Sequence, residues 1–147
     1  PHPPRRPAPR CRSCVLARAH RSRAMAKVLV VEDDVFQSQL LVAMLSECGF
    51  EAVECNSEEE AYEAIESALT PFALAFCDMQ LDDESTELGG LLVVKKLREN
   101  FGKQIKVISL TANEDIEVLD ASIKAGADSH LLKPISQHDI TKICDSV

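Results

Sequence analysis

Short apolar runs alternate with amphipathic stretches along most of the chain. The run at residues 27–31 is continuously apolar after its lysine, as expected of a strand that is buried on both faces of a sheet. Four further runs have a similar length and end close to polar residues. The predicted strands are residues 27–31, 51–55, 72–77, 105–110 and 128–132.

Between these runs, apolar residues recur at helical spacing. In the first such stretch, residues 35–48, one apolar face is expected to hold Phe36, Leu40 and Met44 together with Leu41 and Leu45. The other helices are predicted at residues 57–69, 90–101, 113–124 and from 137 onward.

The expected helix ends carry residues that suit them. Ser57 and Glu60 have the spacing of a capping box, and Asn113 and Ser136 are expected to cap the fourth and fifth helices. Gly49 and Gly126 follow a first and a fourth helix, where a C-terminal glycine is common. The fourth helix carries Ile116, Leu119 and Ile123 in register.

Five strands that alternate with five helices, with no internal repeat and no linker, predict an α/β fold of the (βα)5 type. Such a chain forms a doubly wound parallel five-stranded sheet that is covered by helices on both faces. Ligand sites in these folds lie at the carboxyl ends of the strands.

Charge divides the 147 residues unevenly. Residues 1–24 hold seven of the sixteen basic residues and none of the 24 acids. Residues 25–147 therefore carry a net charge of about −15, whereas the whole chain carries −8. A body this acidic is a poor binder of nucleic acid, and divalent cations or basic protein surfaces suit it better. No apolar run is long enough to span a membrane.

The Pro- and Arg-rich segment 1–24 is interpreted as a disordered or non-native leader, with Met25 as the natural start of a domain covering residues 25–147. A basic interaction tail and a targeting peptide are the alternatives. Cys11 and Cys14 form half of a zinc site without a second half nearby. Cys48, Cys77 and Cys144 lie among apolar residues, which indicates free thiols and a cytoplasmic protein.

Polar groups stand where the predicted strands end. Glu32, Asp33 and Asp34 follow the first strand, Asp78 the third, Thr111 and Ala112 the fourth, and Lys133 and Pro134 the fifth. Clustered carboxylates repel one another unless a cation lies among them, and a set of oxygen ligands favours Mg2+. A carboxylate in such a site can act as a nucleophile toward phosphorus, while a lysine neutralises the charge of the transferring group.

The motifs at these strand ends resemble those of bacterial two-component response-regulator receiver domains of the CheY-like type. The resemblance covers residues 26–147 and rests on Val28-Leu29-Val30-Val31-Glu32-Asp33-Asp34, Phe76-Cys77-Asp78-Met79, Ser109-Leu110-Thr111-Ala112 and the closing Lys133-Pro134. It implies a flavodoxin-like fold with strand order 2-1-3-4-5.

The same resemblance implies a role for each site residue. Asp78 would accept the phosphoryl group, and Asp33, Asp78 and the Gln80 carbonyl would bind Mg2+ directly, with Glu32 acting through water. Lys133 would pair with the phosphoryl group, Thr111 and Ala112 would form the switch, and Pro134 would follow a peptide bond of unusual geometry, which is cis in many family members. Asp34 is expected to cap the first helix instead of binding the metal.

Two features depart from the family pattern. If Gly90 is the glycine that follows the phosphoacceptor loop, that loop is lengthened, lacks its usual proline and gains acids at 82–87, either as a tolerated insertion or as a partner-specific segment. His130 stands where the family places a Tyr or Phe that moves on activation. It is either a neutral replacement or a pH-sensitive switch residue.

The expected function is that of a stand-alone receiver, a monomer or weak dimer that is not an enzyme in the ordinary sense. A sensor histidine kinase or a histidine phosphotransfer protein would phosphorylate it. A downstream protein would bind the face made by the fourth helix, fifth strand and fifth helix. A pseudo-receiver that is never phosphorylated is the main alternative. A haloacid-dehalogenase-like phosphatase is disfavoured because it needs a second Asp two residues after the nucleophile, where this chain has Gln80. A flavin-binding module is disfavoured because the first strand leads into acids and not into a phosphate-binding loop rich in hydroxyl groups and glycine.

Overall fold

The computed structural model describes residues 26–81, 89–112 and 116–147. Five strands form one parallel sheet in the order β2-β1-β3-β4-β5, which confirms the fold predicted from the sequence. The strands are β1 (Lys27–Val31), β2 (Glu51–Cys55), β3 (Leu74–Asp78), β4 (Lys106–Thr111) and β5 (Ser129–Leu132).

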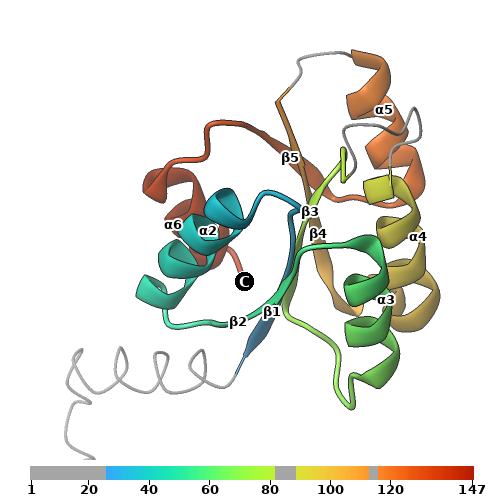
Figure 1. Cartoon of the computed structure of the whole chain (residues 1–147), viewed down its shortest axis with the longest axis horizontal. Helices are drawn as coiled ribbons and strands as arrows, with labels where there is room; N and C mark the ends of the chain where they lie inside the picture. Colours follow the sequence, from blue (N-terminus) through green and yellow to red (C-terminus); the bar gives the residue numbers. More distant parts are fainter. Residues whose placement is uncertain (1–25, 82–88, 113–115) are drawn as a thin grey trace, which may run out of the picture.

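Helices cover both faces of the sheet. Helices α2 (Val35–Glu47) and α6 (Gln137–Asp145) pack on one face, and α3 (Glu58–Ser67), α4 (Gly89–Phe101) and α5 (Ile116–Ala125) pack on the other (Figure 1). A short 3-10 helix, η1 (Gly102–Gln104), follows α4. Asn113, predicted as the cap of α5, lies outside the described residues, as do positions 1–25 and 82–88.

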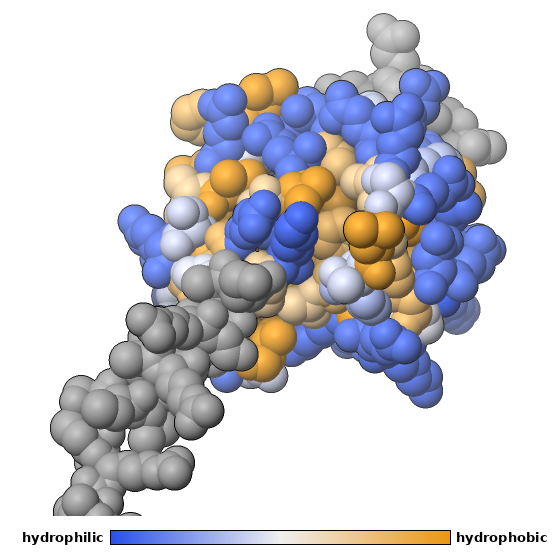
Figure 2. Space-filling view, turned by 90° about the horizontal axis from the view of Figure 1, so that it is seen from below, coloured by the Kyte–Doolittle hydropathy of each residue, from blue (hydrophilic) through white to orange (hydrophobic). Residues whose placement is uncertain are grey.

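The two layers between sheet and helices form two apolar cores, because successive strand residues point to opposite faces. Leu29, Phe72 and Leu97 belong to the core beneath α3 and α4. Phe76 and Leu110 belong to the core beneath α2 and α6. Seen from the side on which β1 begins, the surface is mainly hydrophilic with smaller apolar areas (Figure 2).

Helix α2 differs from the expected apolar face. Leu41 and Leu45 are buried, but Phe36 is 76% exposed and Leu40 is 47% exposed. The buried side of the helix instead includes Ser38. The expected apolar face is therefore only partly buried, because the helix meets the sheet along a narrower stripe than its apolar residues occupy.

The expected caps are mostly confirmed. Ser136 and Asp139 form a complete capping box at α6, and Asp34 caps α2 by accepting a hydrogen bond from the Gln37 N–H at 3.1 Å. Ser57 accepts from the Glu60 N–H at α3, but the Glu60 carboxylate binds the N–H of Asn56 instead of closing a capping box with Ser57. Helix α3 also ends at Ser67, before the predicted position 69.

Gly49 and Gly126 take backbone angles that other residues rarely adopt, with φ of +86° and +121°. Both follow the helices that they were predicted to end. Among the described residues, Cys48, Cys77 and Cys144 form no disulfide bond, as expected, and neither does Cys55. Within the described residues, no helix is both long enough and apolar enough to span a membrane.

A single guanidinium joins α4 to the amino ends of β4 and β5. Arg98 donates to the carbonyls of Gly126 (2.7 Å), Gly102 (2.7 Å) and Ile105 (2.8 Å), and it pairs with Asp128 at 2.7 Å. The same Asp128 oxygen accepts the Val107 N–H at 2.8 Å. These contacts tie three elements together at the end of the sheet opposite the predicted site.

Candidate functional site

The carboxyl ends of the strands surround a cleft of about 430 Å3. Because parallel strands end at the same edge of the sheet, residues far apart in sequence meet there. The residues predicted from the sequence that line the cleft are Glu32, Asp33, Asp78, Gln80, Thr111, Ala112 and Lys133.

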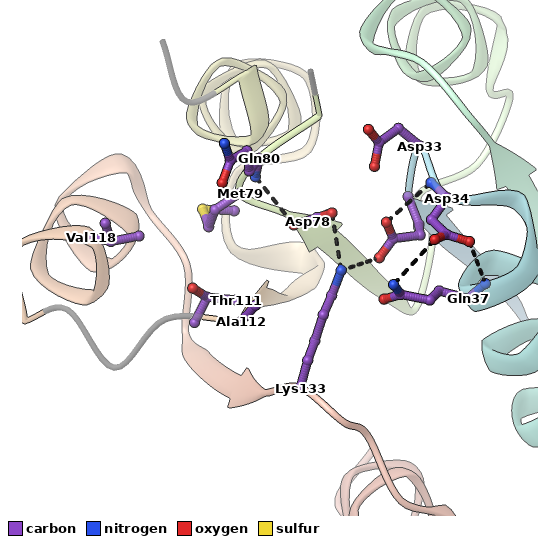
Figure 3. A pocket seen from close by; sticks show the side chains of 11 residues that line it. Asp33, Asp34, Gln37, Asp78, Met79, Gln80, Thr111, Ala112, Val118 and Lys133 are labelled. Atoms are coloured by element: carbon purple, nitrogen blue, oxygen red, sulfur yellow. Dashed lines mark hydrogen bonds and ion pairs between the residues drawn. The ribbon is translucent and has the colours of Figure 1, made fainter. Parts of the chain in front are cut away.

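Lys133 joins the two most deeply buried carboxylates of the cleft. Its ammonium lies 2.6 Å from Glu32 Oε2 and 3.1 Å from Asp78 Oδ2. Figure 3 shows the side chain of Lys133 extending from the end of β5 toward Asp78. Glu32 is only 2% exposed and Asp78 only 6%, so these charges interact in surroundings from which most water is excluded.

The ionisation of this group is strongly perturbed. The pKa of Glu32 is raised to about 8, mainly by burial and also by the adjacent Asp78 carboxylate, while Lys133 opposes the shift only in part. Burial lowers the pKa of Lys133, but the hydrogen bond to Glu32 and the charge of Asp78 outweigh burial, so that its pKa is raised. The lysine therefore stays charged, whereas burial disfavours the ionised form of Glu32.

Three acids approach one another closely enough to share a cation. One carboxylate oxygen from each of Glu32, Asp33 and Asp78 lies within 4.8 Å of the other two. All the donors are oxygens, which suits hard divalent cations such as Mg2+ or Ca2+. The chemistry and the closeness of the donor set therefore fit a divalent cation.

The backbone around Asp78 is held by short contacts. Asp78 Oδ1 accepts the N–H of Gln80 at 3.1 Å, and the N–H of Gly90 binds the Met79 carbonyl at 3.2 Å. A Cβ atom at Gly90 would overlap the Asp78 carbonyl and lie 2.6 Å from the Met79 Cα. Gly90 thus lets the start of α4 approach the backbone of the acceptor strand, while the acidic segment 82–87 lies outside the described residues.

Three predicted positions lie at the edge of the cleft or beyond it. Asp34 lines the cleft, but its carboxylate is engaged by Gln37 as a helix cap. The peptide bond between Lys133 and Pro134 is cis, as the family resemblance implied. His130 is exposed on β5, and its role in a switch stays a prediction.

Some cleft residues were not predicted. Gln37, Met79 and Val118 also line it, and the side-chain amide of Asn56 donates to the Glu32 carbonyl at 2.9 Å. Asn56 follows the end of β2, so the strand-end rule could have found it. Val118 could not be found in this way, because it lies within α5 on the far side of Asp78 from Asp33 (Figure 3).

Comparison with known proteins agrees with this geometry. The sequence profile of the response regulator receiver domain matches residues 28–145. The chain therefore belongs to this family, whose members are signalling modules of two-component systems.

Two curated relatives contain the matching region within much longer chains. The transcriptional regulatory protein ZraR of Escherichia coli K12 is 29% identical over 108 residues, which are 74% of this chain and 23% of ZraR. Hybrid signal transduction histidine kinase L of Dictyostelium discoideum is 32% identical over 127 residues, which are 83% of this chain and 7% of that protein. The chain thus spans less than a quarter of these relatives.

Solved structures confirm the fold. A CheY-like receiver domain protein of Methanospirillum hungatei has a TM-score of 0.72 at 25% identity, and the match covers 82% of this chain and 91% of that one. A response regulator of Burkholderia pseudomallei has a TM-score of 0.68 at 23% identity, with 78% and 64% covered. The latter structure holds a phosphorylated aspartic acid, a calcium ion and citrate.

Proposed function

We propose that this chain is a phosphorylation switch that accepts a phosphoryl group on Asp78. The observation that carries the proposal is the position of Asp78, at the end of β3, with its carboxylate between the Lys133 ammonium and two further acids. A bond would form between an Asp78 oxygen and phosphorus while the bond from phosphorus to a donor imidazole nitrogen breaks. The leaving nitrogen keeps the electron pair and takes up a proton.

The residues around Asp78 have distinct tasks in this proposal. Lys133 places a positive charge beside Asp78 Oδ2, and after transfer its ammonium would pair with the negatively charged phosphoryl group. The N–H of Gln80 orients the other carboxylate oxygen. Thr111, which is 5% exposed at the end of β4, would offer its hydroxyl to the phosphoryl group and so report its presence.

The acids of the cleft would hold Mg2+. Asp33 and Asp78 would bind it with the Gln80 carbonyl, and Glu32 would act through water. When bound, the ion would neutralise negative charge on the phosphoryl oxygens. The phosphorylated aspartic acid and calcium ion in the Burkholderia pseudomallei regulator support both the acceptor and the cation.

Phosphorylation can be tested with a small donor. Incubation with acetyl phosphate and Mg2+ should add the mass of one phosphoryl group to the intact protein, and Asp78→Asn should abolish the addition. Asp34→Asn is the matched control, because Asp34 lines the same cleft yet serves as a helix cap, which Asn also provides. An unmodified parent protein would instead favour a pseudo-receiver.

We also propose that the donor is a protein that contacts α2. An apolar groove of about 460 Å3 adjoins the cleft, with Lys133 lining both. Its walls include the exposed Phe36 and Leu40 together with Pro134. Exposed apolar groups beside a reactive site suit a sensor histidine kinase or a histidine phosphotransfer protein, whose phosphohistidine must reach Asp78.

This contact is tested by comparing two donors. In a Phe36→Ser/Leu40→Ser variant, transfer from a phosphorylated histidine phosphotransfer domain should slow by about tenfold, while labelling by acetyl phosphate stays at the parental rate. Val35→Ser is the control, because Val35 is 52% exposed on the same helix but does not line the groove. Equal slowing with both donors would contradict a docking role.

The opposite side of the cleft offers a face for the downstream partner. Helix α5, strand β5 and helix α6 are the elements expected to form it, and Ile116, Ile123 and Leu132 are exposed there. We propose that a protein target binds this face after phosphorylation. The Ile116→Ser/Ile123→Ser variant should then be labelled normally by acetyl phosphate but lose binding of partners captured by the phosphorylated parent protein.

A further inference from the structure

Two fully buried serine hydroxyls face each other between strand β4 and helix α5. Ser109 and Ser122 are both 0% exposed, and their oxygens are 3.1 Å apart. Ser122 donates its proton to the Leu119 carbonyl at 2.8 Å, so that it accepts the proton of Ser109. The pair is thus a hydrogen bond from Ser109 to Ser122 that joins a helix to the sheet, and the Ser109 hydroxyl has a longer second contact, at 3.4 Å, with the Ser129 carbonyl.

This hydrogen bond is a polar contact between α5 and the sheet, beside the partly buried Val118 and Ala125 of the same helix. Ser122 is the buried residue of α5, whereas Ile116 and Ile123 are 72% and 46% exposed. Helices α2 and α4, by contrast, each bury two or more aliphatic side chains. The seating of α5 therefore depends on a polar contact to an unusual degree, and such a contact is directional where apolar packing is not.

The pair is also aligned with the cleft. Ser109 and Thr111 are two residues apart on β4 and point to the same face of the sheet. Val118 and Ser122 are four residues apart on α5 and lie on the same side of the helix. Val118 and Thr111 both line the cleft, and Figure 3 shows them on the same side of Asp78. Strand β4 and helix α5 thus contact each other through the serine pair, and the same sides of both elements contribute Thr111 and Val118 to the cleft.

We propose that Ser109 and Ser122 are positioning residues whose hydrogen bond sets the resting place of α5, and thereby of Val118, beside Thr111. If the proposed function holds, on which this part rests, the bond opposes the movement of Thr111 toward a phosphoryl group on Asp78. A contact that is stronger in one of two states shifts their equilibrium by the difference in its strength. Loss of one neutral hydrogen bond would shift the balance by about threefold to tenfold.

The test uses Ser109→Ala, Ser122→Ala and the double variant, titrated with beryllium fluoride in the presence of Mg2+. Each variant should bind this phosphoryl mimic about threefold to tenfold more tightly than the parent protein. The double variant should resemble the single ones, because all three lack the same bond. Unchanged or weaker binding, even with a lowered melting temperature, would assign the pair a structural role and overturn the proposal.

Ser38→Ala is the matched control. Ser38 is also 0% exposed, but it lies on α2 at the opposite face of the sheet, and its hydroxyl has no hydrogen-bond partner within the described part of the chain. Its removal should leave the affinity for beryllium fluoride at the parental value. Tighter binding in this variant too would show that any buried serine has the effect, and would contradict the proposal.

A second measurement separates this inference from the proposed function. If the parent protein binds no beryllium fluoride, phosphorylation is in doubt, but the seating of α5 can still be measured without ligand. In Ser122→Ala, amide hydrogens of residues 116–125 should exchange about threefold to tenfold faster, and the Thr111 and Ala112 amide signals should shift in NMR spectra. Unchanged exchange and unchanged signals would overturn the positioning role independently.

Discussion

At the scale of single residues, Gly90 shows how closely the backbone is packed behind the acceptor. The first turn of α4 lies against the Asp78–Met79 peptide, and there is no room for a side chain between them. The sequence suggested Gly90 only through a family pattern. The reason for a glycine at this position is a backbone contact between elements, which local pattern alone does not reveal.

Gly90→Ala should therefore lower the free energy of unfolding by about 1–3 kcal/mol, because either α4 or the end of β3 must move. Urea unfolding measures the change. Gly89→Ala is the neighbouring control, since its Cβ would meet the flexible end of Glu58 at 3.2 Å and the Leu81 side chain at the ordinary contact distances of 3.5 and 3.7 Å. Its stability should be unchanged or raised by up to about 1 kcal/mol, as alanine favours helix. Equal losses in both variants would argue against the close approach.

Glu32 makes stability depend on pH in a predictable direction. Its ordinary pKa of 4.5 is raised to about 8 in the folded protein. Between these values the unfolded chain loses a proton that the folded protein keeps, so that Glu32 lowers stability as pH rises. In EDTA, the urea midpoint of Glu32→Gln should therefore fall less steeply than that of the parent protein between pH 5 and pH 8.

The exposed Glu59 on α3 provides the comparison. Glu59→Gln should leave the parental slope unchanged, because this exposed side chain on α3 does not line the cleft. Addition of Mg2+ should flatten the slope of the parent protein, since a cation stabilises the ionised form of Glu32. Identical slopes in Glu32→Gln and the parent protein would contradict the buried-acid explanation.

At the scale of helices and strands, Arg98 and Lys96 contrast two uses of a positive charge on α4. Arg98 donates to three carbonyls and pairs with Asp128, whereas Lys96 pairs with Glu66 at 2.8 Å. Arg98→Met should lower the free energy of unfolding by about 3 kcal/mol, because the part-buried carbonyls of Gly126 and Ile105 lose their donor. Lys96→Met should remain close to the parent protein in the same urea titration, as expected of a surface pair.

Hydrophobic periodicity predicted nearly all the elements, because strands buried on both faces and amphipathic helices have distinct patterns. It predicted the site as well, since the strand-end rule places acids such as Asp33 and Asp78 together. It failed for Phe36 and Leu40, which are apolar yet exposed beside the cleft. Apolar residues at a surface groove and apolar residues of a core have the same helical spacing.

The contacts between helices and strands could not be predicted from the sequence, for a different reason. A serine within a helix, such as Ser122, looks like an exposed polar residue in sequence, and only the packing of α5 on β4 pairs it with Ser109. The cleft contact of Val118 likewise depends on how α5 lies over the sheet. Such contacts depend on how a helix packs against the sheet. The presence of the helix, by contrast, can be predicted from the pattern of its own residues.

At the scale of the whole molecule, the cleft draws on nearly the full length of the fold. Glu32 and Lys133 are separated by 101 residues, and Asp78 lies between them in sequence. Each acid is therefore synthesised before the lysine that neutralises it. In a nascent chain in which β1 through β4 have left the ribosome but β5 has not, the carboxylates of Glu32 and Asp78 would come together without the ammonium of Lys133.

The last strand thus acts as the closing step of assembly. Until Lys133 arrives, repulsion among Glu32, Asp33 and Asp78 disfavours the docking of β1 beside β3, and long-range pairing of this kind is already slow. A domain built in this way brings the positive charge of Lys133 to its buried acids only when β5 joins the sheet.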